Sequence, residues 1–132
     1  MNIRWLTRGA LEAIHNEQLA EHGGLSGIKD ESALEASLAR PLNKAAYGET
    51  DVFELAAAYL FAIVRDHPFS DGKKRTGYVA SYAFLYLNGY EITADNGLVY
   101  QFVMDVAAGL VSEQSAARWF RDCTAPRASR PS

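Results

Sequence analysis

Two strongly apolar segments on either side of a short charged stretch limit what this chain can fold into. They span residues 55–64 and 78–87, and nearly every position in them is apolar or aromatic. A helix that is apolar on most of its faces is typical of the centre of a bundle. With strand signals nearly absent, we predict an all-α bundle of about six helices, whose two central helices meet at the charged stretch.

Capping residues and prolines set the expected limits of the helices before this pair. Thr7 is a suitable N-cap for a first helix over residues 8–21. Asp30 can cap a second helix, which we expect to stop before Pro41. We interpret residues 43–50, which are polar and lack a helical period, as a loop or short hairpin that could cover a substrate.

The two central helices have their own boundary signals. Asp51 and Glu54 have the spacing of a capping box and open the third helix, residues 51–65. The fourth helix begins within the charged stretch, at about Gly72 or Lys73, and runs to Leu87. Asn88-Gly89 ends it, because glycine permits a left-handed turn.

Two further helices and a tail complete the predicted domain, which spans residues 1–123. Thr93 is expected to cap the fifth helix, with Leu98 among its inward residues, and Ser112 to cap the sixth. Residues 124–132 are rich in Pro, Ser and Arg, and we expect a disordered tail there.

Composition limits the class of protein. The chain has 132 residues, 48% of them apolar, which is enough for one packed core. A net charge of -3 gives no basic field for direct nucleic-acid binding. The single cysteine, Cys123, fits the reducing cytoplasm, and no apolar run approaches the roughly 20 residues that span a bilayer.

The charged stretch brings together groups that bind anions. Residues 67–76 read His-Pro-Phe-Ser-Asp-Gly-Lys-Lys-Arg-Thr. Gly72 lies where the stretch becomes a helix, whose first N–H groups and dipole favour a negative charge. Lys73, Lys74 and Arg75 add formal charge, and the planar guanidinium of Arg75 suits phosphate best.

Two further residues of the stretch could supply chemistry. Asp71 would repel a phosphate unless a divalent cation joins the two, and Mg²⁺ binds such a combination of oxygens. The imidazole of His67 suits a general base for a hydroxyl nucleophile. A base, a metal ligand, an anion site and an arginine are the recurring parts of phosphoryl or nucleotidyl transfer.

Each part also has an ordinary structural explanation. A histidine at a helix end is as often a cap, Asp-Gly is a common turn, and Lys-Lys-Arg is more often a solvated run of charge. The functional interpretation depends on their coincidence in one stretch between the two most apolar helices.

The stretch resembles the signature loop of the Fic/Doc family, and of its death-on-curing (Doc) toxin branch in particular, on the string His67-x-Phe69-x-Asp71-Gly72-x-Lys74-Arg75-Thr76. Softer likeness extends over about residues 14–120. The resemblance implies a Fic-fold helical bundle and a transferase that uses a nucleotide to modify a protein hydroxyl. It places the catalytic residues at His67, Asp71, Lys73 and Arg75, with Asp71 as the Mg²⁺ ligand. It places the ATP-binding residues at Gly72, Lys73, Lys74, Arg75 and Thr76.

The resemblance also implies a product and partners. Most Fic proteins transfer AMP, whereas Doc toxins phosphorylate elongation factor Tu and halt translation. Lys74 stands where Fic enzymes have glycine and Tyr78 where they have a second arginine, so phosphate transfer is favoured and AMP transfer is the alternative. The implied partner is a Phd-like antitoxin. The chain has no convincing inhibitory Ser/Thr-x-x-x-Glu-Gly/Asn segment, which fits inhibition by a separate protein.

One position departs from the family pattern, because Lys73 occupies the place of an asparagine. Lysine offers only donors and a charge, and it cannot replace an amide that also accepts a hydrogen bond. We therefore expect transfer to be weakened or abolished.

Two other functions remain open. The first is a catalytically dead module of the same fold, kept as an antitoxin-binding partner or co-regulator. The second is a metal-dependent phosphohydrolase that uses Asp66 and His67 with His15 and His22. The second does not explain residues 72–75, and we otherwise expect His15 and His22 at a helix surface or bracing a loop.

Overall fold

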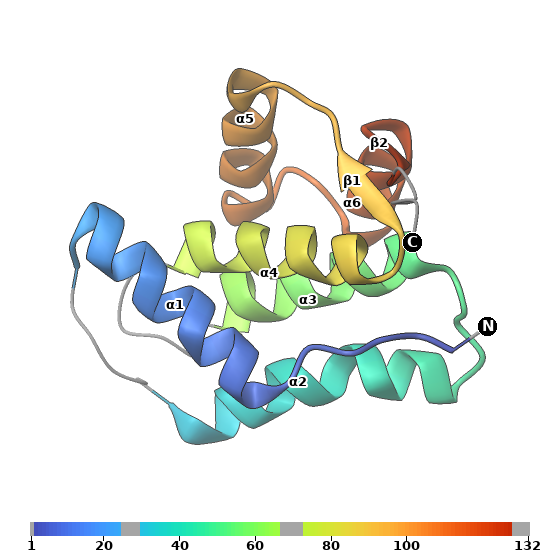
Figure 1. Ribbon diagram of the computed structural model, residues 1–132, viewed down its shortest axis with the longest axis horizontal. Helices are drawn as coiled ribbons and strands as arrows, with labels where there is room; N and C mark the ends of the chain where they lie inside the picture. Colours follow the sequence, from blue (N-terminus) through green and yellow to red (C-terminus); the bar gives the residue numbers. More distant parts are fainter. Residues whose placement is uncertain (1, 25–29, 67–72, 128–132) are drawn as a thin grey trace, which may run out of the picture.

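The computed structural model describes residues 2–24, 30–66 and 73–127 (Figure 1). These residues form six helices and one two-stranded sheet, which confirms the predicted all-α bundle. The helices are α1 (Arg8–His22), α2 (Glu31–Ala46), α3 (Val52–Asp66), α4 (Lys73–Leu87), α5 (Asn96–Ala107) and α6 (Glu113–Asp122). None of the described helices is both long enough and apolar enough to cross a membrane.

Helix α3 forms the centre of the core. It packs against α2, α4 and α6, and every residue from Leu55 to Val64 is buried. The prediction of a central apolar helix is therefore confirmed. In Figure 1, α3 and α4 lie one above the other through the middle of the molecule, with α1 crossing them and α2 below.

A glycine allows α4 to approach α3 closely. A Cβ atom on Gly77 would lie 2.8 Å from Cγ2 of Val64, closer than two carbon atoms pack. One turn further along, the buried Ser81 hydroxyl lies 3.1 Å from the Ala56 carbonyl of α3 and 3.0 Å from the Gly77 carbonyl of its own helix. These contacts fix the first turn of α4 beside the last turn of α3.

Helix α2 is longer than predicted. It continues through Pro41 to Ala46, so the predicted stop before Pro41 and the predicted loop over residues 43–50 are wrong for the residues that are helical. Pro41 is buried, and the contact of α2 with α3 offsets the backbone hydrogen bond that proline cannot donate. Only residues 47–50 remain as a connection, with Gly48 at a φ of 106°.

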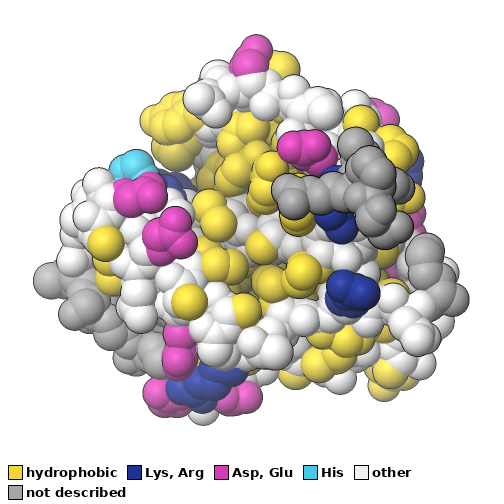
Figure 2. Space-filling model, in the orientation of Figure 1, with side chains coloured by type: hydrophobic (Ala, Val, Ile, Leu, Met, Phe, Trp, Pro, Cys, Tyr) yellow, Lys and Arg dark blue, Asp and Glu magenta, His cyan; other side chains and the backbone are white. Residues whose placement is uncertain are grey.

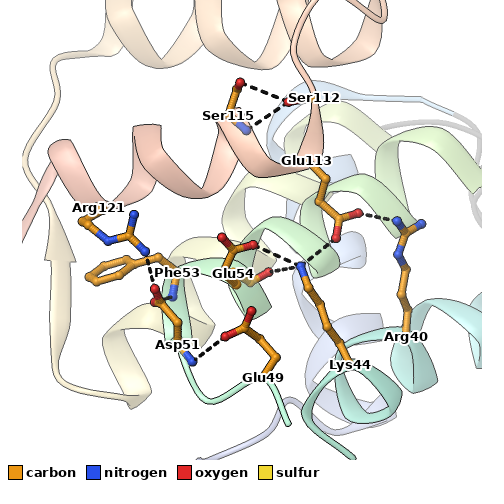
Figure 3. Close-up of polar contacts among 10 residues, drawn as sticks. All are labelled: Arg40, Lys44, Glu49, Asp51, Phe53, Glu54, Ser112, Glu113, Ser115 and Arg121. Carbon is orange, nitrogen blue, oxygen red and sulfur yellow. Dashed lines mark hydrogen bonds and ion pairs between the residues drawn. The ribbon is translucent and has the colours of Figure 1, made fainter. Parts of the chain in front are cut away.

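The extended α2 also brings Lys44 into an ion-pair network with two other helices (Figure 3). Nζ of Lys44 donates to Oε2 of Glu113 in α6 at 2.9 Å and to Oε2 of Glu54 in α3 at 3.2 Å. Arg40 pairs with the other oxygen of Glu113. Burial alone would lower the pKa of Lys44, but its hydrogen bonds and charge interactions with both glutamates raise it.

This network changes how α3 is capped. The Asp51 carboxylate accepts from the Phe53 N–H at 2.8 Å, as a capping residue should. The Asp51 N–H donates to Glu49, at 3.1 Å, rather than to Glu54. The predicted capping box is therefore only half present, because Glu54 binds Lys44 instead.

The chain after α6 pairs with the segment after α4. Strand β2 (Thr124–Pro126) is antiparallel to β1 (Tyr90–Ile92), and the Arg127 N–H donates to the Gly89 carbonyl at 2.7 Å. The predicted disordered tail is therefore wrong for residues 124–127. Residues 128–132 lie outside the described part of the chain.

Helix α5 begins two residues later than predicted. Its N-cap is Asp95, whose side chain accepts from the Leu98 N–H, whereas the Thr93 hydroxyl donates to the Cys123 carbonyl. Leu98 is 56% exposed, so its predicted inward position is wrong. In Figure 1 the first turn of α5 projects away from α3 and α4, and its last turn approaches them.

We expect Gly77→Ala to lower the free energy of unfolding by about 1–3 kcal/mol, because the added methyl group overpacks the contact with Val64. Gly9→Ala is the matched control at an exposed position of helix α1, where none of the described neighbouring atoms lies closer than 4.0 Å to the new methyl group. It should stabilise by up to about 1 kcal/mol through helix propensity. Urea denaturation measures both, and equal effects would contradict the close crossing.

Candidate functional site

The structure places four of the predicted site residues on the first turn of α4. Lys73 begins the helix, followed by Lys74, Arg75 and Thr76. His67, Asp71 and Gly72 lie outside the described residues, so their predicted roles stay predictions. The described part of the site therefore consists of the first turn of α4 and the elements that pack around it.

The first turn of α4 carries an unfavourable charge for a helix. It contains Lys73, Lys74 and Arg75 and no acidic residue. The start of a helix has a partial positive charge, so each cation there costs roughly 0.3–1 kcal/mol where an acid would stabilise. A bound anion would reverse that cost, which is the arrangement expected at a phosphate-binding helix start.

A cavity of about 350 Å³ lies beside this turn. Helix α3 contributes its last turn, α4 its first turn and α5 its last turn. The residues that line it are Val64, Arg65, Lys73, Lys74, Met104, Ala107 and Ala108. Three of the seven are cations and the others are apolar, so the cavity combines positive charge with partial exclusion of water.

Arg75 points away from that cavity. Its Nη2 donates to the Gly23 carbonyl, at the end of α1, at 3.4 Å. Its Nε is buried and has no hydrogen-bond partner in the described structure. The three predicted cations are therefore divided, with Lys73 and Lys74 on the α5 side of the helix start and Arg75 on the α1 side.

Thr76 is fully buried, and its hydroxyl also has no hydrogen-bond partner in the described structure. The burial of Thr76 favours a role in packing the start of α4 against its neighbours over direct contact with a nucleotide. Tyr78, one position after the glycine of the crossing, is half-buried against Tyr82, with ring centroids 6.4 Å apart. Burial, with the charges of Tyr82 and Cys123, raises the pKa of Tyr78 to about 12.

His15 and His22, the histidines considered as alternative metal ligands, differ in their exposure to solvent. His15 is 2% exposed, which excludes a helix-surface position and leaves loop bracing as its predicted role, whereas His22 lies at the exposed end of α1 beside Glu21. Among the described residues, no group of three or more His, Cys, Asp or Glu side chains could hold a metal ion. Asp66 ends α3, and His67 is not among the described residues.

Arg65 is a site residue that the sequence analysis did not identify. It occupies the last turn of α3, and its Nη1 donates to the Val106 carbonyl of α5 at 3.4 Å. Its position two residues before His67 was the available signal. An arginine at a helix end is common, however, so the cavity is what distinguishes this one.

Residues 5–85 match the sequence model of the Fic/DOC family. That match covers more than half of the chain, including α3 and the first turn of α4. The chain belongs to the Fic/DOC family.

Two relatives extend this family assignment over most of the chain. The chain is 34% identical over 120 residues to a protein named "Protein kinase doc" from Escherichia phage P1, which covers 90% of this chain and 94% of the relative. It is 35% identical over 104 residues to a protein named "Toxin Doc" from Mycolicibacterium smegmatis, covering 76% and 72% respectively. The family therefore supports a nucleotide-dependent enzyme that modifies proteins.

If the first turn of α4 is adapted to an anion, Lys74→Glu should stabilise the free protein and weaken ATP binding. We expect a gain of about 0.5–1 kcal/mol in the free energy of unfolding, since an acid replaces a cation at the helix start. Arg118→Glu makes the same charge change at an exposed position inside α6 and should give neither effect. Thermal unfolding and calorimetric titration measure the pair, and a destabilised Lys74→Glu would refute the electrostatic argument.

Proposed function

We propose that this protein is the toxin of a toxin–antitoxin module and acts as a protein kinase in the cytoplasm. The observation that carries the proposal is the cationic first turn of α4 beside a partly apolar cavity, in a chain of the Fic/DOC family. The names of the two relatives, a protein kinase and a toxin, support the same conclusion.

In this proposal each residue of the charged stretch has its own role in the reaction. His67 accepts the proton of the target hydroxyl, whose oxygen then attacks the γ-phosphorus of ATP while ADP leaves. Gly72 and the N–H groups after it bind phosphate oxygens, and Arg75 neutralises charge from the α1 side. For this last role the guanidinium exchanges its long contact with Gly23 for phosphate.

Magnesium is the proposed cofactor, with Asp71 as its protein ligand. A carboxylate and phosphate oxygens are the usual ligands of Mg²⁺ at nucleotide sites, and the ion neutralises charge on the transferred group. The nearby cations of α4 fit a polyphosphate. They disfavour a bare metal ion, so we expect Mg²⁺ to arrive with the nucleotide.

Phosphate transfer is favoured over AMP transfer by two positions of α4. Lys74 lines the cavity, so a cation stands where AMP-transferring relatives have glycine. Tyr78 packs against Tyr82 and offers no positive charge where those relatives have an arginine. AMP transfer is the second candidate product, because the family includes both reactions.

We propose that Lys73 weakens phosphate transfer. The alternative to a weakened kinase is a catalytically dead module that still binds its antitoxin. Lys73 lines the cavity at the first position of α4, where asparagine would offer a neutral donor and acceptor. An additional positive charge there competes with Mg²⁺ for phosphate oxygens and for Asp71.

The proposed partners are a Phd-like antitoxin and a protein substrate, elongation factor Tu. On the face drawn in Figure 2, hydrophobic side chains are exposed over α4 between α1 and α5. Two tyrosines of α4 are also accessible: Tyr82, which is half-buried, stacks on Tyr86, which is 37% exposed. We propose that exposed apolar side chains of α4 receive an amphipathic helix of the antitoxin.

Intact-mass measurement of elongation factor Tu after incubation with ATP and Mg²⁺ tests the proposal. We expect Lys73→Asn to add one phosphate to the target at least tenfold faster than the unaltered chain, because the amide restores the acceptor that lysine lacks. Expression of the same variant should arrest growth more strongly.

The double variant Lys73→Asn with His67→Ala is the control, and it should modify nothing. Addition of AMP would select the second candidate reaction. No modification by Lys73→Asn, together with growth as good as that of the unaltered chain, would leave the binding module as the better account.

A further inference from the structure

We propose that one face of α5, centred on Tyr100, receives an apolar side chain of the protein substrate, next to the residue whose hydroxyl is modified. This inference rests on the proposed function, which puts the nucleotide phosphates beside the first turn of α4. It deepens that proposal by naming a docking surface outside the charged stretch and the chemistry of the substrate segment that fits it.

Tyr100 lies on the face of α5 that leads out of the cavity. Met104 and Ala108 line the cavity and follow Tyr100 by one and two helical turns, and side chains at this spacing share one face of a helix. Side chains in a helix lean toward its N-terminus, so the Tyr100 ring extends from Met104 away from the cavity. The ring is 66% exposed, which places it at the rim.

The opposite side of α5 is different in both position and charge. Leu98 is 56% exposed and points to that side, because two residues turn a helix by about 200°. Asp105 is the only charged residue of α5, all of which the structure describes, and it lies two turns after Leu98 on the same side. Its carboxylate accepts from Nε2 of Gln101 at 2.9 Å. The side with Tyr100 is therefore uncharged, and it is the side that continues into the cavity.

The side chains on this face suit an apolar partner. A tyrosine ring offers a large contact area with only two torsions to order, and tyrosine is enriched in protein interfaces for this reason. Met104, one turn further along, has a flexible thioether that adapts to apolar groups of different shape. Neither side chain carries a charge that would attract an acidic or a basic residue of the partner.

The transfer reaction brings the protein substrate to this rim. The attacking oxygen must come within about 3–3.5 Å of the phosphorus. Hydroxyl side chains are short, so the substrate backbone must reach the mouth of the cavity and the residues beside the hydroxyl must lie on its rim.

The two sides of the rim offer different chemistry to the two reactants. Arg65 and Lys74 are exposed on the side of α3 and α4, where they match the phosphates of the nucleotide. The α5 side offers the Tyr100 ring, which has no charge to match a phosphate. The nucleotide thus takes the cationic side, and the α5 side is left to a substrate segment with an apolar residue next to its hydroxyl.

Steady-state kinetics with ATP and elongation factor Tu, the substrate proposed above, test this inference in the full chain, with and without Lys73→Asn. Tyr100→Ala should raise the KM for the protein about tenfold, the loss expected when a central interface tyrosine is truncated. The KM for ATP and the melting temperature should not change, because the ring is exposed and lies outside the cavity. Tyr100→Phe keeps the ring and should keep the KM for the protein.

Leu98→Ala is the matched control. It removes an exposed apolar side chain from the opposite side of the same helix and should change neither KM. Equal effects of Leu98→Ala and Tyr100→Ala would overturn the inference.

Calorimetric titration with elongation factor Tu in the presence of a non-hydrolysable ATP analogue measures the same contact without turnover. Tyr100→Ala should raise the Kd about tenfold, and Leu98→Ala should leave it unchanged. Binding that Tyr100→Ala weakens, in a chain that modifies nothing, would support the docking surface and count against the kinase.

The remaining outcomes would overturn the inference. A normal KM and Kd for the protein in Tyr100→Ala would do so while the kinase proposal stands. A raised KM for ATP alone would assign Tyr100 to the nucleoside. A dimer in sedimentation equilibrium that Tyr100→Ala dissociates would show that a second copy covers the face. A chain that neither binds nor modifies elongation factor Tu would overturn both the docking surface and the proposed substrate.

Discussion

The close crossing of α4 over α3 at Gly77 is the contact on which the candidate site depends. It allows α4 to approach α3 with no side chain of its own at this point, so that the Val64 side chain of α3 packs directly against the glycine. The first turn of α4 thereby lies next to the last turn of α3, and Lys73 and Arg65 line the same cavity. A larger residue at Gly77 would push the start of α4 away from both.

The charged side chains near the two ends of α3 are arranged differently. Near its start, Lys44 and Arg40 are matched by Glu54 and Glu113, and the network holds three helices together (Figure 3). Near its end, the described cavity lining holds three cations and no carboxylate. The first arrangement is typical of structural ion pairs, and a cluster of cations at a cavity is typical of a functional site. Helix α3 thus connects an ion-pair network that stabilises the fold with a cationic cavity that lowers stability in the absence of a ligand.

The sequence was sufficient for the elements whose local signals agree with their packing. Helix α3 is apolar nearly all round from Leu55 to Val64, which favours a central place in the bundle. Thr7 and Ser112 cap their helices as predicted. It was insufficient where a distant contact overrides a local rule. The burial of Pro41 continues α2 past its expected stop, and the pairing of β2 with β1 orders residues that look like a tail.

The same distinction holds for the candidate site. Lys73 and Lys74 could be selected from sequence because the charged stretch is contiguous, but their separation from Arg75 around the helix start required the neighbours of α4. Arg65 could not be selected, because its role depends on α5, about 40 residues later in the chain. Leu98 was misplaced because the first turn of α5 extends beyond the core that its spacing anticipates.

The central claim is that the start of α4 is a phosphate-binding helix terminus. Backbone amide NMR during titration with ATP and Mg²⁺ tests it most directly, because the N–H groups of residues 73–76 report on an anion at the helix start. The account predicts that these amides show the largest shift changes, together with the end of α5 near Val106. Changes confined to other helices, with the amides of residues 73–76 unmoved at saturation, would contradict it.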